Sequence, residues 1–364
     1  MNEEMYPNGK VIVIHDTDGH GILSGAIAYK VLREKNCEAI LAGQWARHGS
    51  STTPYGITEF LRSTITPRSL KSQDIDMMIL LDIPVPVQEP STFVKTLTEY
   101  AKMGIKVLYI DHHGHNEYHR LMLERGITPV ITSTSYDLSM YLPRLYNVID
   151  EEIERLALIA SAFDYDSSVA LRISTELEEY VERLDQWIKG SAKQIEDLQW
   201  YDRHIGTEGR LAVFIANRGS QYLLNIARSL PEIPIVSYEV IGDVVLAKEF
   251  PKSGLAWKTA SKLCRLTGAK VAVVPASSPR GYSVIVARYW RTSETIIPII
   301  EDVVKEYSVG RTVVGHLGAR SIAVTSESEA FQLAEQIARE LTGRISSPIY
   351  TTKITSNEKM PSTC

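Results

Sequence analysis

Short apolar segments alternate with amphipathic segments over the first 165 residues of the chain. Five apolar segments have the length and composition of buried strands: 11–15, 39–43, 77–83, 107–111 and 129–132. Four intervening or following segments have helical spacing: 22–34, 91–103, 115–125 and 151–163. This alternation predicts an α/β domain, a parallel sheet with helices on both faces.

The pattern changes beyond this region and then resumes. Residues 171–199 are charged and amphipathic, as in a connecting helix, and a further helix is expected over 210–230, closed by Pro231 and Pro234. Alternation then predicts a smaller α/β domain, with strands at 235–241, 243–249, 271–275 and 282–289 and helices at 257–266 and 293–307. The expected organisation is a catalytic domain, a helical connector, a second domain and a flexible tail, at 1–170, 171–234, 235–345 and 346–364.

Charge is distributed unevenly between these regions. The net charge is −5, but residues 252–320 hold eleven Lys and Arg against four acids, a local balance of +7 that leaves −12 elsewhere. A basic second half beside an acidic first half suits a polyanionic substrate that one domain holds and the other cleaves. Chance clustering on a solvated face is the alternative.

Composition excludes several classes of protein. No apolar run approaches the ~20 residues of a membrane span, and the first residues lack the pattern of a secretion signal. Three scattered cysteines, Cys37, Cys264 and Cys364, argue against a disulfide framework or zinc–thiolate site. We therefore expect a cytoplasmic protein with no membrane contact.

Acidic residues follow the ends of the predicted strands. Asp16 and Asp18 follow the first strand, whereas Asp82 and Asp111 end two later ones. Because the carboxyl ends of parallel strands share one edge of a sheet, these acids are expected to converge, together with His112 and with Asp164 from the end of an apolar helix. Carboxylates so close together repel unless a divalent cation offsets their charge, so the pattern predicts a metal site. Oxygen-rich coordination with one or two imidazoles suits phosphate-ester hydrolysis.

Each of these residues also has a simpler interpretation. A single Asp commonly caps a turn, and only the ordered set favours metal binding. Asp82 is central in this order and is the expected bridge between two cations. His113 is expected to face the phosphate or hold the water, with a packed or capping histidine as the alternative. His15 and His20 could each be a spare ligand or a solvent-facing loop histidine.

The motifs resemble those of the DHH phosphoesterase superfamily, which includes RecJ-type exonucleases, nanoRNases and family II pyrophosphatases. The four matching segments are His15–Gly19, Leu81–Ile83, Asp111–His113 and Ser161–Asp166. The resemblance implies one or two Mn²⁺ or Mg²⁺ ions. By resemblance, the metal ligands are Asp16, Asp18, Asp82, His112 and Asp164, and the catalytic residues are Asp111, His112 and His113.

The second half resembles the substrate domain associated with DHH proteins. Its glycine-rich signature is matched by residues 314–320, and an arginine ends the strand at 282–288. The resemblance implies that the substrate's phosphates or terminal nucleotide are bound by Arg288, Gly315, His316 and Gly318. Glycines allow the backbone to approach a phosphate closely.

Two positions depart from the family pattern. The family usually carries a metal-binding histidine four residues before the first Asp, where this chain has Ile12. One metal position therefore loses a ligand, which His15 or a water would have to replace. The first glycine of the second-domain signature is Val314. Both departures would suit a partly degenerate relative.

The resemblance and the charge pattern together lead to a ranked set of functions. The first is a metal-dependent phosphodiesterase or exonuclease acting on single-stranded DNA or RNA or on short oligonucleotides. Aromatic residues near the basic region could stack on bases, or could simply pack in a core: Trp257, Tyr282, Tyr289 and Trp290. The alternatives are a catalytically weakened binding or scaffold protein of the replication or repair machinery, and a small-molecule phosphatase or pyrophosphatase. A homodimer and a replication or repair partner are left open.

Overall fold

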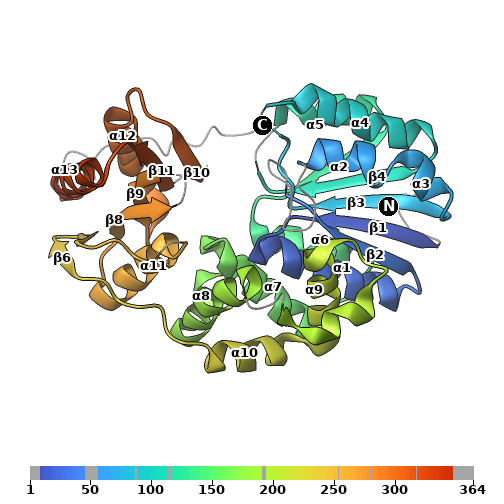
Figure 1. Cartoon of the computed structure of the whole chain (residues 1–364), viewed down its shortest axis with the longest axis horizontal. Coiled ribbons are helices and arrows are strands. Elements are labelled where there is room, and N and C mark those ends of the chain that lie inside the picture. The colour runs from blue at the N-terminus through green and yellow to red at the C-terminus, as the bar shows by residue number, and fades with distance from the viewer. Residues whose placement is uncertain are drawn as a thin grey trace, which may run out of the picture. The chain divides into compact units, whose positions relative to one another are not determined.

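The computed structural model describes residues 9–45, 56–86, 88–113, 116–190, 194–252, 254–278, 281–316 and 318–346. The chain divides into two compact units, Met1–Leu230 and Pro231–Cys364, which are described separately below (Figure 1). His115, Leu317 and nearly all of the predicted tail lie outside the described residues.

The N-terminal unit is built on a five-stranded sheet with the order β2-β1-β3-β4-β5, and all of its strands are parallel. The strands are β1 (Lys10–His15), β2 (Glu38–Gly43), β3 (Ile75–Leu81), β4 (Lys106–Asp111) and β5 (Ile127–Ile131). The predicted parallel sheet is confirmed. From β1 the chain moves to β2 on one side and later returns to place β3 on the other, so the strand order reverses between β1 and β3. In parallel sheets, ligands bind beyond the carboxyl ends of the strands at such a reversal.

Helices cover both faces of this sheet (Figure 1). One face packs against α2 (Ile57–Ser63), α4 (Pro90–Lys102) and α5 (Asn116–Glu124). The other carries α1 (Gly19–Glu34), in contact with α6 (Ser135–Leu145), α7 (Glu151–Phe163) and α9 (Gly206–Arg218). The remaining elements of the unit are α3 (Pro67–Lys71), η2 (Ser167–Arg172), α8 (Thr175–Lys189), η4 (Glu196–Tyr201) and α10 (Ser220–Ser229).

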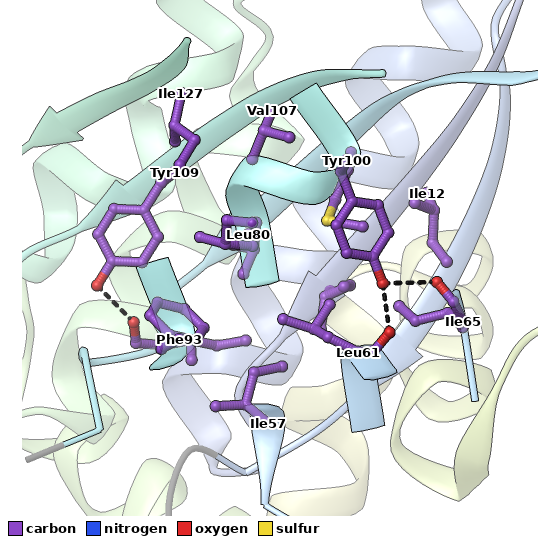
Figure 2. Packing of buried hydrophobic residues seen from close by; sticks show 14 of the residues in the cluster. Ile12, Ile57, Leu61, Ile65, Leu80, Phe93, Tyr100, Val107, Tyr109 and Ile127 are labelled. Carbon is purple, nitrogen blue, oxygen red and sulfur yellow. Dashed lines mark hydrogen bonds between the residues drawn. The ribbon is translucent and has the colours of Figure 1, made fainter. Parts of the chain in front are cut away.

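The core between the sheet and α2, α4 and α5 is almost wholly apolar (Figure 2). The two tyrosines buried in it each satisfy their hydroxyl group. Tyr100 donates to the carbonyl oxygen of Ile65 at 2.7 Å, and the Tyr109 hydroxyl lies 2.7 Å from the carbonyl oxygen of Ile83. Buried hydroxyls without partners would be costly, so these contacts allow large aromatic rings to fill the core.

The first turns of α1 lie very close to the end of β1. A Cβ atom added to Gly21 would lie 2.6 Å from the carbonyl oxygen of Asp16, and one added to Gly25 would lie 2.6 Å from Cδ2 of His15. Glycine at these two positions therefore lets the helix pack directly against the strand end. This close packing brings the start of α1 to the edge of the sheet where the acids lie.

The single helix predicted over 210–230 is wrong. The structure has two helices there, α9 and α10, separated at Gly219, whose φ is +82°. A left-handed backbone favours glycine and ends a helix. Because apolar spacing continues on both sides of this glycine, the pattern alone predicts a single helix.

The C-terminal unit contains a six-stranded mixed sheet with the order β10-β11-β9-β8-β7-β6. Its strands are β6 (Tyr238–Ile241), β7 (Val244–Ala247), β8 (Val271–Ser278), β9 (Gly281–Arg288), β10 (Val313–His316) and β11 (Ala319–Val324). Only β7 and β8 pair in parallel. The sequence pattern predicts β6, β7, β8 and β9 but neither β10 nor β11.

Each face of the second sheet has its own apolar core. One core includes residues of α12 (Ile297–Tyr307) and α13 (Glu327–Ile345), and the other includes residues of α11 (Ala256–Thr267). The short η5 (Glu294–Ile296) precedes α12. The sequence pattern does not predict α13. Within the described ranges, no helix is both long and apolar enough to cross a membrane.

Candidate metal centre

The strand ends bring the acids of the N-terminal unit together. The Asp82 amide donates to the carbonyl oxygen of Ile110 at 3.0 Å, and the Asp16 amide donates to that of Leu81 at 3.3 Å. These backbone bonds join the carboxyl ends of β1, β3 and β4. Asp82 itself has a φ of +60° and is only 2% exposed. A non-glycine residue with this backbone is uncommon, and here it turns the chain sharply at the centre of the cluster.

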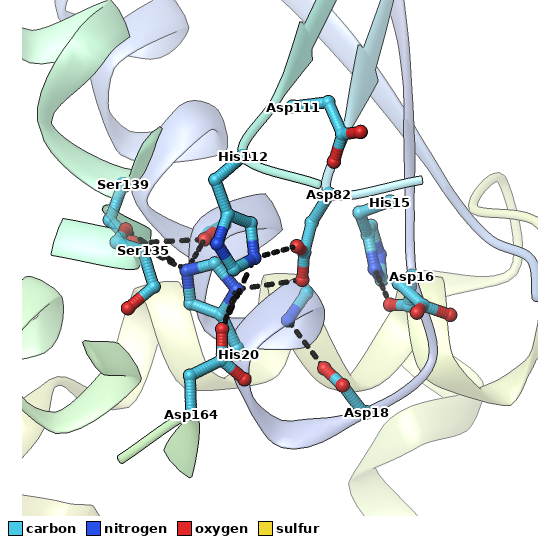
Figure 3. A network of polar contacts seen from close by, with 12 residues as sticks. His15, Asp16, Asp18, His20, Asp82, Asp111, His112, Ser135, Ser139 and Asp164 are labelled. Carbon is cyan, nitrogen blue, oxygen red and sulfur yellow. Dashed lines mark hydrogen bonds and ion pairs between the residues drawn. The ribbon is translucent and has the colours of Figure 1, made fainter. Parts of the chain in front are cut away.

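Four side chains from four segments form the central cluster, which we call the His20 cluster: His20, Asp82, His112 and Asp164 (Figure 3). The Nδ1 atom of His20 lies 2.7 Å from Asp82 Oδ2 and 3.1 Å from Asp164 Oδ2. The Nε2 atom of His112 lies 3.1 Å from Asp82 Oδ1 and 3.3 Å from Asp164 Oδ2. The structure therefore brings Asp82, His112 and Asp164 together, as the sequence pattern predicts.

The solvent-facing interpretation of His20 is wrong. His20 lies in the first turn of α1, is fully buried, and enters the cluster. Its other ring nitrogen, Nε2, lies 3.1 Å from the carbonyl oxygen of Ser135 and 3.2 Å from Ser139 Oγ. The signal that could have found it is the helix start: Asp18 caps α1, which places residue 20 inside the helix rather than in a loop.

Two buried atoms of the cluster lack hydrogen-bond partners, namely Asp82 Oδ1 and His112 Nε2. They face each other at 3.1 Å, as an ion pair when His112 is protonated. Ligand atoms ~2.1 Å from a cation lie ~3.0 Å apart in an octahedron and ~3.4 Å apart in a tetrahedron. The contacts within the cluster, 2.7 to 3.3 Å, fall mostly in this range. The donor set therefore fits a divalent cation.

A second group, formed by Asp111 and His113, lies beside the first and shares Asp82 with it. His113 Nδ1 lies 2.7 Å from Asp111 Oδ1, and the Tyr109 hydroxyl lies 3.1 Å from Asp111 Oδ2. Asp111 is fully buried, so its two oxygens are fixed by these neighbours. This arrangement orients the imidazole of His113 and sets which of its nitrogens faces the carboxylate.

The first-motif residues lie next to the His20 cluster but outside it. Asp18 Oδ1 accepts the amide of Gly21 at 2.9 Å, and Asp16 Oδ1 accepts that of Thr17 at 2.7 Å. Among the described residues, neither joins the groups with converging ligand atoms. His15 does not join them either; it is fully buried, so the solvent-facing interpretation is wrong for it too. Ile12 packs into the apolar core of the sheet.

The electrostatics reflect this crowding. Burial raises the pKa of Asp16 well above its usual range, and Asp18 and Asp82 raise it further. Burial alone would also raise the pKa of Asp82, but His20 and His112 hold it well below its usual range. Burial disfavours charge on His20, yet Asp82 and Asp164 outweigh it and raise the pKa of His20 to about 9. The site thus contains buried acids without enough positive charge beside them, together with imidazoles that are held in the protonated, cationic form.

The predicted substrate residues of the second unit lie around the β10–β11 hairpin. The Arg288 amide donates to the carbonyl oxygen of Gly318 at 2.7 Å, and the Gly318 amide donates to Glu301 Oε1 at 2.9 Å. Gly315 has a φ of +116° and His316 is the last residue of β10. Trp290 is 2% exposed, which supports core packing for this residue over the alternative of stacking on bases.

No protein-family model matches the sequence, and no curated protein matches it. Solved structures do. A DHH-domain protein described as a member of the S1p family of ribosomal proteins is 17% identical, with 92% of this chain and 86% of that one covered and a TM-score of 0.54. An exopolyphosphatase-related protein from Bacteroides fragilis is 12% identical, with 94% of each chain covered and a TM-score of 0.50.

These similarities, at such low identity, establish the fold. The protein belongs to the class of two-unit α/β proteins in which polar residues gather at the carboxyl edge of a parallel sheet. More particularly, the chain shares its fold with a solved DHH-domain protein and with an exopolyphosphatase-related protein.

Proposed function

We propose that the protein is a divalent-metal-dependent phosphoesterase. The observation that carries the proposal is the convergence of two imidazoles and two carboxylates on one point, where the buried atoms Asp82 Oδ1 and His112 Nε2 have no hydrogen-bond partner. A divalent cation bound there would supply Lewis-acid polarisation of a phosphate ester and a water of lowered pKa. Asp82, His112 and Asp164 would hold it, with Asp16 and Asp18 close by.

His113 is the residue best placed to move a proton. Burial opposes its charge, but the hydrogen bond and charge of Asp111 raise its pKa above the usual value. Asp111 engages Nδ1, so Nε2 is the nitrogen that would give a proton to the departing oxygen of the ester. Asp111 is therefore a positioning residue in this proposal, and His113 is the catalytic acid.

The proposed substrate is a single-stranded nucleic acid or a short oligonucleotide. The local charge of +7 over residues 252–320 supports a polyanion. Arg288 and the hairpin glycines, Gly315 and Gly318, would bind phosphate, as would His316. The proposed ion is Mn²⁺ or Mg²⁺, and one or two ions are compatible with the two groups that share Asp82.

The test combines calorimetry and hydrolysis on purified full-length protein. Mn²⁺ and Mg²⁺ are titrated into chelator-treated protein, and hydrolysis is followed on single-stranded DNA, RNA, dinucleotides and inorganic polyphosphate. The polyphosphate arm is included because an exopolyphosphatase-related protein shares the fold. Hydrolysis of at least one substrate, dependent on the metal, is expected. No metal binding and no hydrolysis would contradict the proposal.

A matched pair of variants assigns the activity to the cluster. Asp82→Asn removes a central ligand charge. Asp76→Asn changes an exposed acid on β3, the strand that Asp82 follows, and this acid pairs with Lys71 at the surface. Asp82→Asn is expected to abolish metal binding and hydrolysis, and Asp76→Asn to retain both. Equal effects in the two variants would show that the cluster is not responsible.

A second candidate is a non-catalytic binding protein with the same fold. The observation that favours it is Ile12, which is 1% exposed in the apolar core where the superfamily motif has a histidine ligand. This candidate predicts strand binding without hydrolysis under any metal. Fluorescence anisotropy with labelled oligonucleotides, run beside the hydrolysis assay, separates the two functions.

A further inference from the structure

We propose that His20 is a metal ligand through Nδ1, so that the ion is held by two imidazoles and two carboxylates. The inference rests on the proposed metal-dependent function. It assigns a role to a residue that the motifs do not include and that the sequence leaves open between a spare ligand and a loop histidine. It concerns one ligand of the His20 cluster and its consequence for the choice of metal.

The first argument is the hydrogen-bonding state of the His20 ring. Nε2 lies 3.1 Å from the carbonyl oxygen of Ser135, and a carbonyl oxygen can only accept. Nε2 therefore carries a hydrogen. Nδ1 then points at Asp82 Oδ2 and Asp164 Oδ2, at 2.7 and 3.1 Å. The lone pair of Nδ1 would repel both carboxylates unless a cation lay between them. A proton on Nδ1 is that cation when no metal is bound, and a bound divalent ion would take its place.

The second argument is that the anchor of Nε2 is itself fixed. Ser135 begins α6, where Thr134 caps the helix. Its hydroxyl donates to Asp166 Oδ2 at 2.8 Å, and the amide of Tyr136 donates to the same oxygen at 3.0 Å. Metal-binding histidines usually donate their other ring N–H to a carbonyl or carboxylate, which fixes the ring. The surroundings of His20 supply this feature.

The third argument comes from the other buried histidines of the unit. His15 Nδ1 lies 2.7 Å from the carbonyl oxygen of Asp16, and the ring packs against Gly25. His204 Nδ1 accepts the amide of Leu41 at 3.0 Å. Neither enters the converging groups among the described residues, whereas His20 lies 0% exposed within one. The fold thus directs this imidazole specifically toward the acids.

The consequence is a preference among metals. Mg²⁺ favours oxygen ligands and retains its waters, whereas Mn²⁺, Co²⁺ and Zn²⁺ accept imidazole nitrogen readily. Two nitrogens from His20 and His112 therefore favour a transition metal over Mg²⁺. His20 acts as a specificity-determining ligand in this proposal.

The test counts nitrogen ligands directly. One equivalent of Mn²⁺ is added to full-length, chelator-treated protein, and electron spin-echo modulation reports the coordinated imidazole nitrogens. Two are expected in the unaltered protein and in His119→Gln, a control histidine on α5, and one is expected in His20→Gln. Calorimetry is expected to show that His20→Gln weakens Mn²⁺ binding by about 10-fold or more, with a smaller effect on Mg²⁺.

The outcomes separate this inference from the proposed function. Mn²⁺ binding with one nitrogen in the unaltered protein, or an unchanged spectrum in His20→Gln, would overturn the role of His20 and leave the metal site standing. No Mn²⁺ binding by the unaltered protein would overturn both. If His20→Gln does not fold, the nitrogen count of the unaltered protein still decides, because a single nitrogen excludes His20 and His112 acting together.

Discussion

Replacement of Gly25 by alanine tests the close packing of α1 on β1. The added Cβ would lie 2.6 Å from Cδ2 and 2.9 Å from Cγ of His15. Ordinary contact requires ~3.5 Å, so the atoms must separate by about 0.9 Å. His15 cannot swing away, because it is fully buried and its Nδ1 lies 2.7 Å from the carbonyl oxygen of Asp16.

The magnitude follows from two opposing effects. Alanine in place of glycine within a helix stabilises by ~1 kcal/mol, whereas overpacking a tight contact costs ~1–3 kcal/mol. A net destabilisation of about 1 kcal/mol is therefore expected for Gly25→Ala. The matched control is Gly343→Ala in α13, where an added Cβ meets nothing within 4 Å. Gly343→Ala therefore has the stabilising effect of alanine without the overpacking, and should stabilise its helix by ~0.5–1 kcal/mol.

Hydrogen exchange followed by mass spectrometry at increasing urea measures the two helices separately, since peptides from α1 and α13 report on different units. The expected result is a change of opposite sign in the two variants. Stabilisation of α1 by Gly25→Ala would refute the reasoning, because it would mean that the helix does not press on His15 as the structure shows.

Three further predictions concern the site and the second unit. Tyr109→Phe removes the hydroxyl shared by the Ile83 carbonyl and Asp111; urea unfolding should show a loss of ~1–3 kcal/mol, and a loss near zero would contradict it. Gly315→Ala places a Cβ 2.2 Å from the Ala319 carbonyl oxygen at a φ of +116°, and it should lower the free energy of unfolding in urea by ~2–4 kcal/mol. The control Gly310→Ala, at a φ of +75° with open space around the Cβ, should lower it by only ~1 kcal/mol. The metal-free protein should lose stability with rising pH, since the pKa of His20 is raised from 6.5 to about 9 in the folded chain. The stabilisation by protonated His20 is complete below pH 6.5 and is lost toward pH 9. Chelator-treated protein with the same free energy of unfolding at both ends of this window would refute the prediction.

The sequence predicted the sheet and part of the site for one physical reason. Parallel strands bring their carboxyl ends to one edge, so acids that follow strands must gather there whatever their separation in the chain. Asp82 and Asp111 were identified in this way. Asp164 was identified because a long apolar helix ends just before it.

Other features depended on geometry that the sequence pattern does not express. The pattern leaves the role of His20 open because it predicts a helix that starts at residue 22, whereas α1 begins at Gly19. The helix α6, which holds the His20 ring, mixes polar and apolar residues and contains Pro143, so it was not predicted. The distinction between Asp18 as a helix cap and Asp18 as a ligand also requires coordinates, because both roles use the same residue type.

The contacts of Asp166 have a consequence for how this protein can change over time. Asp166 lies two residues beyond Asp164 and accepts from both Ser135 and Tyr136. This short turn therefore supplies Asp164 to the His20 cluster directly and, through α6, fixes the orientation of the His20 ring. A substitution that loosens this turn would disturb both at once, so tolerated replacements at 135 and 166 are expected to occur as compensating pairs.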